Sequence, residues 1–513
     1  MSRTLSLRGR VISSCCWAVF LICAAPTAGA RAQSVAPREA DALGRVAVSG
    51  IPTEQAKKPK PEIGRALQRW NVIANDASGL DHTPVRPGDV RIFGEQLGPT
   101  RASRAMAIVH VAMFESLNAL DRRFTSYVGL PAADKAKKIS ADAAVAQAAR
   151  DTLVALFPSQ AASFDGALAE DLALVTKHVE REGGIALGHA AAAAILGLRT
   201  NGGSARAEPR VGIEFITGTA PGDWRQDPIS RIPIALGAFW SQVRPFVLSS
   251  ASQFRVAPPP PLASGAYADA FAEVKRLGGD GVVTPTVRTP DQTFVGIYWA
   301  YDGTPSLCAP PRLYNQITRT IAQQRGTEGL DLARLLALVN VAMADAAIAV
   351  WESKFFYEFW RPITGIRESE PGTGPSGAGD GNAATLGDPS FTPLGAPASN
   401  LAGPNFTPPF PAYPSGHAGF GGALFQTLRS FYGTDAIAFT FVSDEWNGIT
   451  RGSDGVVRPL TPRSFTSLSQ AEEENGQSRI YLGIHWSFDK TAGIAQGRAV
   501  ATQVFGQVFR PVR

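Results

Sequence analysis

Residues 329–360 constrain the fold most, because they predict one long helix in a chain whose other patterns are also largely helical. Pro362 follows this helix and cannot continue it, so the helix is expected to stop there. A second helical pattern starts at Thr100, a favourable N-cap. Its apolar residues recur at steps of three and four, at Met106, Val109, Met113, Leu117 and Leu120. These patterns predict a mainly α protein.

Other segments extend this prediction. Ser140 opens an alanine-rich helix that Pro158 stops, Ser159 caps another, and a further helix runs to about Leu198, before the Asn-Gly-Gly sequence at 201–203. Two more helices are predicted over residues 415–431 and 487–508, and residues 436–466 are expected to be β-like or irregular. The four prolines at 258–261 predict a stiff connector. Residues 368–412 form a Gly-, Pro- and Ala-rich loop of unusual length, which is either disordered or functional.

The first 32 residues are typical of a secretory signal peptide. They hold four arginines and no acid, a mostly apolar run over residues 11–25, and small residues at −3 and −1 before a cleavage site after Ala32. Ala28-Gly29-Ala30 offers a second cleavage signal two residues earlier, whereas a membrane anchor would need about 20 apolar residues. We therefore expect an exported protein, periplasmic or secreted. Residues 33–65 are predicted to be a flexible N-terminal segment.

Removal of the leader changes the charge and the cysteine count. The leader contributes +4 to the formal net charge of +5, so the mature chain is expected to carry a net charge of +1, and Cys308 is its only cysteine. An internal disulfide is then impossible. The near-neutral charge, and no later run that we read as a membrane span, give no case for a nucleic acid or membrane partner.

Two of the six histidines lie in patterns that indicate chemistry, His417 and His485. His110 is expected to be a hydrogen-bonded structural residue within its helix, and His82 is expected in a loop. His178 and His189 have no partners at metal-ligand spacing. Because neither a His-Glu-x-x-His nor a paired-cysteine pattern exists, a zinc site is disfavoured.

His417 ends the sequence Pro-Ser-Gly-His at 414–417, where the long loop meets a predicted helix. Ser415 is a natural N-cap, and Gly416 lets the backbone approach a ligand closely. The free N–H groups of a helix start attract anions, and His417 beside them can move a proton. An ordinary capped helix start would show the same residues, so this motif alone is weak.

His485 and Asp489 lie one helical turn apart if a helix begins there. Asp489 would then accept the imidazole Nδ1–H and leave Nε2 free as a ligand or nucleophile. Arg479, six residues before His485, offers a planar fork for an oxyanion. The simpler interpretation is a surface arginine and an aspartate in a first helical turn.

Lys354 and Arg361 lie seven residues apart on the long predicted helix, so two turns place them on one face. Trp351 and several phenylalanines make the neighbourhood apolar, and cations there need an anionic partner. A solvated basic face is the alternative. If the three segments converge, they form a cage for a tetrahedral oxyanion.

These segments together resemble the vanadium-dependent haloperoxidase and type 2 phosphatidic acid phosphatase superfamily. Its three motifs, Lys-x6-Arg-Pro, Pro-Ser-Gly-His and Ser-Arg-x5-His-x3-Asp, are present complete and in order at residues 354–362, 414–417 and 478–489. The strong match covers residues 339–508 and is similar to the soluble, chloroperoxidase-type haloperoxidases more than to the membrane phosphatases. The resemblance implies an all-α fold of two helical bundles, with the vanadate or phosphate site in the C-terminal bundle. We expect a helical region over residues 66–257 and the second bundle over residues 262–513.

The resemblance also implies a role for each site residue. His485 would be the direct vanadium ligand, and His417 the acid–base residue. Lys354, Arg361, Ser415, Gly416 and Arg479 would hold the other vanadate oxygens. Asp489 would support His485, and Lys354 would also polarise the peroxide. Hydrogen peroxide would then oxidise halide to hypohalous acid, with phosphate as a competing occupant of the site.

Two questions stay open at this point. Phe410 matches the aromatic residue of the chloroperoxidase type. A residue that only packs in the core would also be aromatic here, so the sequence does not decide whether the protein prefers chloride or bromide. The second hypothesis is a soluble acid phosphatase with His485 as the nucleophile and His417 protonating the leaving group. A non-catalytic oxyanion-binding protein is a third, which would not need His417.

Overall fold

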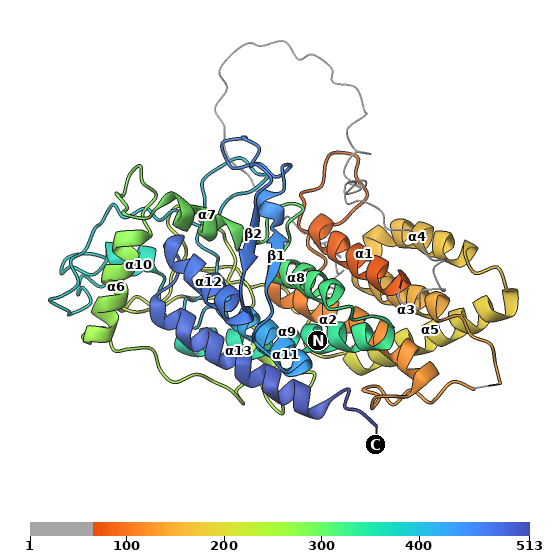
Figure 1. Ribbon diagram of the computed structural model, residues 1–513. Helices are drawn as coiled ribbons and strands as arrows, with labels where there is room; N and C mark the ends of the chain where they lie inside the picture. Colours follow the sequence, from red (N-terminus) through yellow and green to blue (C-terminus); the bar gives the residue numbers. More distant parts are fainter. Residues whose placement is uncertain (1–64, 135, 513) are drawn as a thin grey trace, which may run out of the picture. The chain divides into compact units, whose positions relative to one another are not determined.

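The computed structural model describes residues 65–134 and 136–512, and these contain thirteen α-helices and one two-stranded sheet (Figure 1). The all-α prediction is therefore confirmed. The described residues all belong to one compact unit. The predicted signal peptide and nearly all of the predicted flexible segment fall in residues 1–64, outside the described residues. The predicted division near residues 257–262 stays a prediction.

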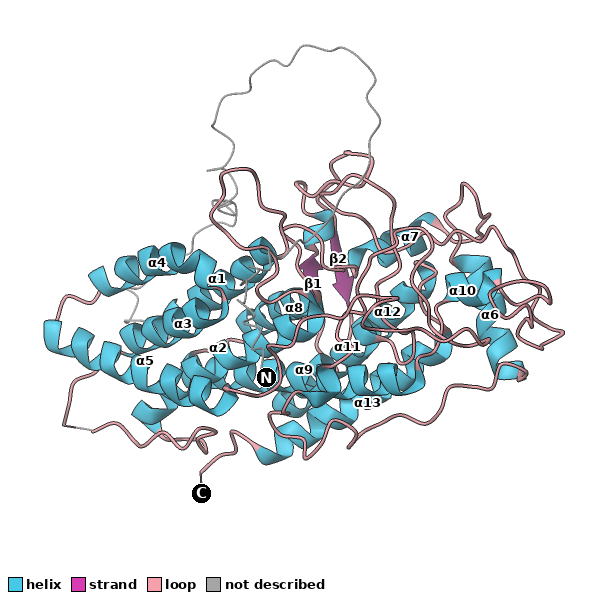
Figure 2. Ribbon diagram, turned by 180° about the vertical axis from the view of Figure 1, so that it is seen from behind, coloured by secondary structure: helices cyan, strands magenta, loops and turns pink. Residues whose placement is uncertain are grey.

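The N-terminal half is a group of helices packed against one another (Figure 2). They are α1 (Arg65–Asp81), α2 (Gly98–Asp121), α3 (Ala141–Leu156), the 3-10 helix η2 (Pro158–Gln160), α4 (Ala161–Ala173) and α5 (His178–Arg199). Ser140 caps α3 as predicted and accepts the Ala143 N–H at 3.2 Å. Thr100 is not the N-cap of α2: the helix starts at Gly98, with Leu97 at the cap and Pro99 in the first turn, where a proline is tolerated.

The C-terminal half holds the remaining elements. They are the 3-10 helix η3 (Trp240–Gln242), α6 (Gly265–Leu277), α7 (Pro290–Tyr298), α8 (Pro310–Gln324), α9 (Gly329–Tyr357), α10 (Pro362–Arg367), α11 (Gly416–Tyr432), the 3-10 helix η4 (Asp444–Trp446), α12 (Leu468–Tyr481) and α13 (Ser487–Gln507). The β-like stretch is confirmed: β1 (Phe439–Val442) pairs antiparallel with β2 (Pro462–Phe465), and Phe439 lies opposite Phe465. No helix or strand interrupts residues 368–412, as predicted for the long loop.

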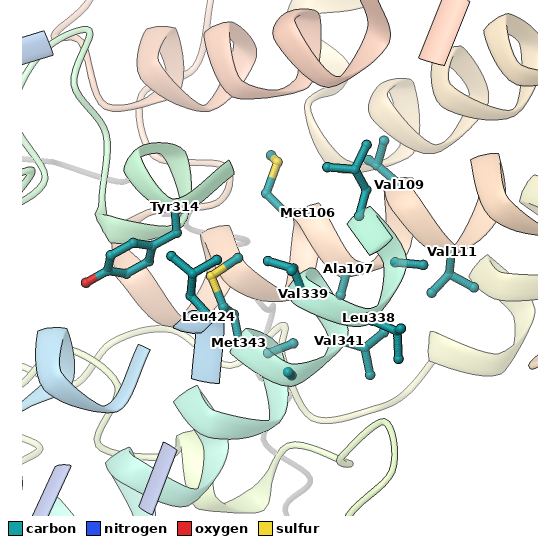
Figure 3. Close-up of a cluster of buried hydrophobic side chains, with 14 of the residues drawn as sticks. Met106, Ala107, Val109, Val111, Tyr314, Leu338, Val339, Val341, Met343 and Leu424 are labelled. Carbon is teal, nitrogen blue, oxygen red and sulfur yellow. The ribbon is translucent and has the colours of Figure 1, made fainter. Parts of the chain in front are cut away.

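Helix α9 is the centre of the molecule, packed against α2 on one side and α11 and α13 on the other. Figure 3 shows the junction: Met106 and Val109 of α2, Val339 and Met343 of α9, and Leu424 of α11 belong to one hydrophobic cluster. We expected no further apolar run long enough to span a membrane, but among the described helices α9 is one by length and composition, and 94% of its apolar window is buried inside the protein. Burial from all sides explains why its polar face is so small.

Candidate active site

The three predicted segments converge at the C-terminal end of α9, next to the N-termini of α11 and α13 (Figure 1). Arg361 Nη1 lies 2.9 Å from His485 Nε2, which joins the first motif to the third. The Ser415 N–H donates to the Asp489 carbonyl at 3.0 Å, which joins the second motif to the third. Every site residue predicted from the sequence therefore lies in one neighbourhood.

Lys354 lies in the last turn of α9 and is fully buried. Its Nζ donates to the Pro411 and Ala412 carbonyls at 2.8 and 2.9 Å, and it lies 5.1 Å from the centre of the Phe410 ring. Burial lowers the pKa of Lys354 well below its usual value, Arg361 lowers it further, and Asp489 opposes both. An anion bound nearby would restore the charged form, because it supplies the counter-charge that burial removes.

Arg361 is not on α9, so the prediction that it shares a helix face with Lys354 is wrong. The helix ends at Tyr357, and Glu358 adopts a left-handed conformation with its N–H bonded to the Lys354 carbonyl. Residues 359–361 then run extended beside residues 222–224, as expected before a proline. The Arg361 guanidinium donates to the carbonyls of Phe410 and Ile484, at 2.9 and 2.8 Å. Burial lowers its pKa to about 9, which leaves it charged at neutral pH.

His485 has a defined tautomer. Its Nδ1 lies 2.8 Å from Asp489 Oδ2, which also accepts the Trp486 N–H at 3.0 Å. Because a carboxylate accepts, Nδ1 carries the proton, and Nε2 presents a lone pair that accepts from Arg361. Helix α13 begins at Ser487, so His485 precedes it and Asp489 lies in its first turn. Burial lowers the pKa of His485 well below its usual value, with Arg361 and Lys354 acting in the same direction.

Ser415 and Gly416 start α11 as the motif predicts. The Ser415 hydroxyl accepts the Ala418 N–H, and a Cβ on Gly416 would come within 3.1 Å of the Trp351 ring, so a side chain there would crowd the tryptophan. His417 follows on the same turn, and its Nε2 lies 2.5 Å from the Ala300 carbonyl. Since a carbonyl only accepts, Nε2 carries the proton and Nδ1 is the basic nitrogen. Burial lowers the pKa of His417 well below its usual value, and Arg479 adds to this effect.

Arg479 lies in the last turn of α12 and is almost fully buried. Its Nη2 pairs with both carboxylate oxygens of Asp302, at 2.7 and 2.8 Å, while Nε and Nη1 have no partner among the described residues. Burial raises the pKa of Asp302, and Arg479 opposes that shift. Asp302 was not predicted as a site residue, because it lies in an irregular loop far from every motif.

Phe410 forms the apolar wall of the site. It lies 5.0 Å from the Arg361 guanidinium, and its ring centre is 4.9 Å from that of Trp351. The Phe410 ring is only 8% exposed, so this side of the site offers an apolar surface beside Lys354 and Arg361. An anion held there would be poorly hydrated and strongly attracted.

The donor set fits a tetrahedral oxyanion. Three buried basic groups, Lys354, Arg361 and Arg479, face two buried carboxylates, Asp302 and Asp489. Burial raises the pKa of Asp489 to about 7, so the site carries a positive excess when Asp489 is protonated or when Lys354 is in its charged form. The two unpartnered nitrogens of Arg479 are buried donors that need an acceptor. An oxyanion would supply the acceptors and neutralise the excess charge.

The other histidines lie outside this site. His110 is confirmed as a buried, hydrogen-bonded residue of α2, and His82, also buried, follows the end of α1 and bonds to the Ser78 carbonyl. His178 and His189 are exposed on α5. His189 has a partner that its own segment does not reveal, since its Nδ1 lies 2.5 Å from Asp151 of α3.

Comparison with known proteins gives consistent matches. Residues 334–513 match the family described as the VCPO second helical-bundle domain. Over 527 aligned positions the chain is 31% identical to the vanadium chloroperoxidase of Curvularia inaequalis, covering 87% of this chain and 82% of that protein.

Two solved structures share the fold. The first bacterial vanadium-dependent iodoperoxidase is similar with a TM-score of 0.69 at 24% identity, over 89% of this chain and all of that one. An apo-type bacterial vanadium-dependent chloroperoxidase is similar with a TM-score of 0.60 at 13% identity, over 80% of this chain and 94% of that one.

Proposed function

The chain belongs to the vanadium chloroperoxidase family, and on this premise we propose that it holds vanadate in the site described above and uses hydrogen peroxide to oxidise halide to hypohalous acid. One observation carries the assignment of the site. Three buried basic side chains, a helix N-terminus and the lone pair of His485 Nε2, from three separate segments, meet at one place.

Each residue has a role that follows from its contacts. His485 would bind vanadium through Nε2, since Asp489 holds the proton on Nδ1. Lys354, Arg361 and Arg479 would hold the remaining oxygens, together with the Gly416 N–H and the Ser415 hydroxyl at the start of α11. Fixed donors in a site without water stabilise a charged group strongly, at about 3 kcal/mol per donor.

Vanadate supplies a Lewis-acid centre that activates peroxide toward halide. The protein supplies the proton transfer. Because His417 is neutral and donates through Nε2 to the Ala300 carbonyl, its Nδ1 can accept a proton from the entering peroxide and return it later. Lys354, held by two carbonyls, places a positive charge on the peroxide side of the site.

The apolar wall determines which halides can be used. Phe410 and Trp351 offer no hydrogen bonds to the halide, so a halide must lose water to approach, and chloride loses more hydration energy than bromide or iodide. We propose that the protein oxidises bromide. The ratio of the kcat/KM values for chloride and bromide would then measure how far attraction to the cationic neighbours of Phe410 offsets the hydration energy that the halide loses.

One assay tests the function. Purified protein, freed of bound anions and then given vanadate, is supplied with peroxide and bromide or chloride, and halogenation of a dye is followed. A separate sample receives p-nitrophenyl phosphate. Vanadate-dependent halogenation supports the proposal. Absence of halogenation with vanadate, alongside ester hydrolysis that phosphate inhibits, would assign the cage to a phosphatase instead.

We also propose that the protein is exported, with cleavage after Ala32. The arginines, apolar run and small residues of positions 1–32 support this. Mass spectrometry of the N-terminus of protein recovered from the periplasm or the medium tests it. A mature chain that starts at residue 33 is expected, and a chain in the cell interior that retains the first 32 residues would contradict it.

A further inference from the structure

The loop between α7 and α8 supplies two groups to the site, although it belongs to none of the motifs. Its Ala300 carbonyl accepts from His417, and its Asp302 carboxylate pairs with Arg479. The loop also has left-handed backbone at three non-glycine positions, Tyr301, Ser306 and Cys308, with φ of 47°, 68° and 59°. Residues in this conformation persist only when their surroundings hold them.

The segment from Ser443 to Glu445 is what holds the first part of this loop. The Ser443 hydroxyl donates to the Tyr298 carbonyl at 2.7 Å, and the Asp444 N–H donates to the Tyr301 hydroxyl at 2.6 Å. The Glu445 carboxylate accepts the backbone N–H of Tyr301 at 3.4 Å. Three successive residues therefore clamp the loop on both sides of Ala300.

Glu445 is itself a buried hub with no exposed surface. Its Oε2 accepts from the Ser399 hydroxyl at 2.6 Å and from Arg458 Nη1, which also donates to Ser399 at 2.9 Å. Burial raises the pKa of Glu445 to about 7, Arg458 opposes this shift, and Asp302 adds to it. The charges of Asp302 and Glu445 therefore influence each other. Each carboxylate also pairs with an arginine, Asp302 with Arg479 and Glu445 with Arg458.

Ser399 and Arg458 come from two long irregular segments. Ser399 lies in the Gly- and Pro-rich loop of residues 368–412, and Arg458 lies between η4 and β2. Both converge on a single carboxylate that contacts the loop carrying Asp302. In the series Arg479, Asp302, Glu445, Arg458 the two carboxylates lie between two guanidinium groups, so each carboxylate has a counter-charge.

We propose that the Glu445–Arg458 pair is a positioning pair for the oxyanion site, which acts through Ala300 and Asp302 to orient His417 and Arg479. This inference rests on the proposed function, because it concerns how tightly the same site binds vanadate. It assigns a role to Ser399 of the long loop, which anchors the site indirectly through Glu445, whereas Phe410, Pro411 and Ala412 at the end of the same loop contact Lys354 and Arg361 directly.

Substitution of Glu445 by glutamine is the direct test. Three donors converge on the carboxylate, and an amide offers only one acceptor oxygen, so its NH2 group must face the Tyr301 N–H or the Ser399 and Arg458 donors. The loop should shift, and we expect the Kd for vanadate, measured by titration calorimetry on vanadate-free protein, to rise about 10-fold. Arg458→Gln should have a similar effect, because Glu445 then loses its counter-charge and one of the three donors that hold its carboxylate in place.

Two further variants keep the test decisive. Glu115→Gln is the matched control, since Glu115 is a buried glutamate of α2 that also accepts from three donors, the Ser126 hydroxyl and the backbone N–H groups of Tyr127 and Val128. Its Kd should stay within twofold of wild type. Ser399→Ala removes one bond to Glu445 and is mild enough to fold if the charge variants do not, and its Kd should rise about threefold.

The outcomes separate the two proposals. Wild-type protein that binds no vanadate contradicts the proposed function. Wild-type protein that binds vanadate while Glu445→Gln, or Ser399→Ala if the former does not fold, binds within the error of wild type contradicts the positioning role. Weakening of the same size in Glu115→Gln also contradicts it, because the effect would then reflect general destabilisation.

Discussion

Asp302 binds Arg479 through one guanidinium nitrogen only. Both carboxylate oxygens lie within 2.8 Å of Nη2, while Nε and Nη1 have no partner among the described residues. The pair therefore fixes the plane of the guanidinium and leaves its other donors for an anion. A buried ion pair of this kind adds little net stability to the fold, but it holds the Arg479 side chain in one orientation.

Asp302→Asn should raise the Kd for vanadate about 10-fold. Loss of the carboxylate also removes a charge that repels the anion, but a buried guanidinium without its partner can rotate, and we expect this second effect to dominate. Titration calorimetry on vanadate-free protein measures the Kd. Asp171→Asn is the control, because Asp171 is equally buried and pairs with Arg69 in the N-terminal half. Tighter binding by Asp302→Asn would show that repulsion dominates.

His485→Ala should abolish halide oxidation at every vanadate concentration. The substitution removes the lone pair of Nε2, which none of the neighbouring cations can replace. The protein should still fold, because Asp489 keeps its bond to the Trp486 N–H. Rates are measured over a vanadate titration with circular dichroism as the folding control. Full activity at saturating vanadate would refute the ligand assignment.

His417→Ala should reduce turnover far more than binding. Because His417 is neutral, it does not attract the anion by charge, and its removal should change the Kd for vanadate by about twofold or less. Loss of a general acid–base group, in contrast, lowers kcat by about 100-fold or more. Calorimetry and steady-state rates are compared on the same preparation. Equal losses in affinity and in kcat would remove the proposed proton-transfer role.

Vanadate or phosphate binding should be coupled to proton uptake by Lys354. Burial lowers the pKa of this lysine in the anion-free protein, and a bound anion raises it. Above the lowered pKa, binding must therefore take up a proton, and affinity should fall as the pH rises until the pKa of the complex is passed. Calorimetry of phosphate binding in two buffers of different ionisation enthalpy gives the proton number. Lys354→Met should take up fewer protons than wild type at the same pH, and an unchanged number would contradict the assignment.

The motifs were predictable because each places its chemistry within a few residues of one segment. Ser415 shows this well: its side chain caps α11 as its position before a helical pattern indicates. The acceptors around the site were not predictable, since the carbonyls of Ala300, Pro411 and Ala412 carry no side-chain signature. Asp302 lies 177 residues from Arg479, and no spacing rule connects two loops that meet only in the folded chain.

The fold shows a similar limit. The helices predicted over residues 329–360 and 487–508 have boundaries close to those of α9 and α13. Helix α12 was not predicted, because its first turns are acidic and its apolar periodicity is weak. The sequence signal for the start of α12 was Ser467, whose hydroxyl accepts the Gln470 N–H as an N-cap. Arg361 shows why the helix prediction failed at its end: a left-handed residue at Glu358 is rare in a non-glycine position, and no pattern indicates it.

Stability should fall as the pH drops from about 6.5 to 4, partly through His110. This histidine donates through Nδ1 to the Met106 carbonyl and accepts the Asn71 amide at Nε2, so only the neutral form fits its buried position, and burial lowers its pKa to about 4. In the unfolded chain this histidine has a pKa near 6.5 and so binds a proton more readily than in the folded protein. Lowering the pH through this window therefore lowers the free energy of unfolding, by up to about 3 kcal/mol in total, and the effect levels off below the folded pKa.

His110→Gln preserves an acceptor and a donor but cannot be protonated, so it should remove this part of the pH dependence. Denaturant unfolding of wild type and variant across the window measures the difference in free energy. The two curves should converge as the pH falls, because only the wild type loses the contribution. Curves that stay parallel from pH 6.5 to 4 would show that His110 either remains neutral in both states or is protonated without cost.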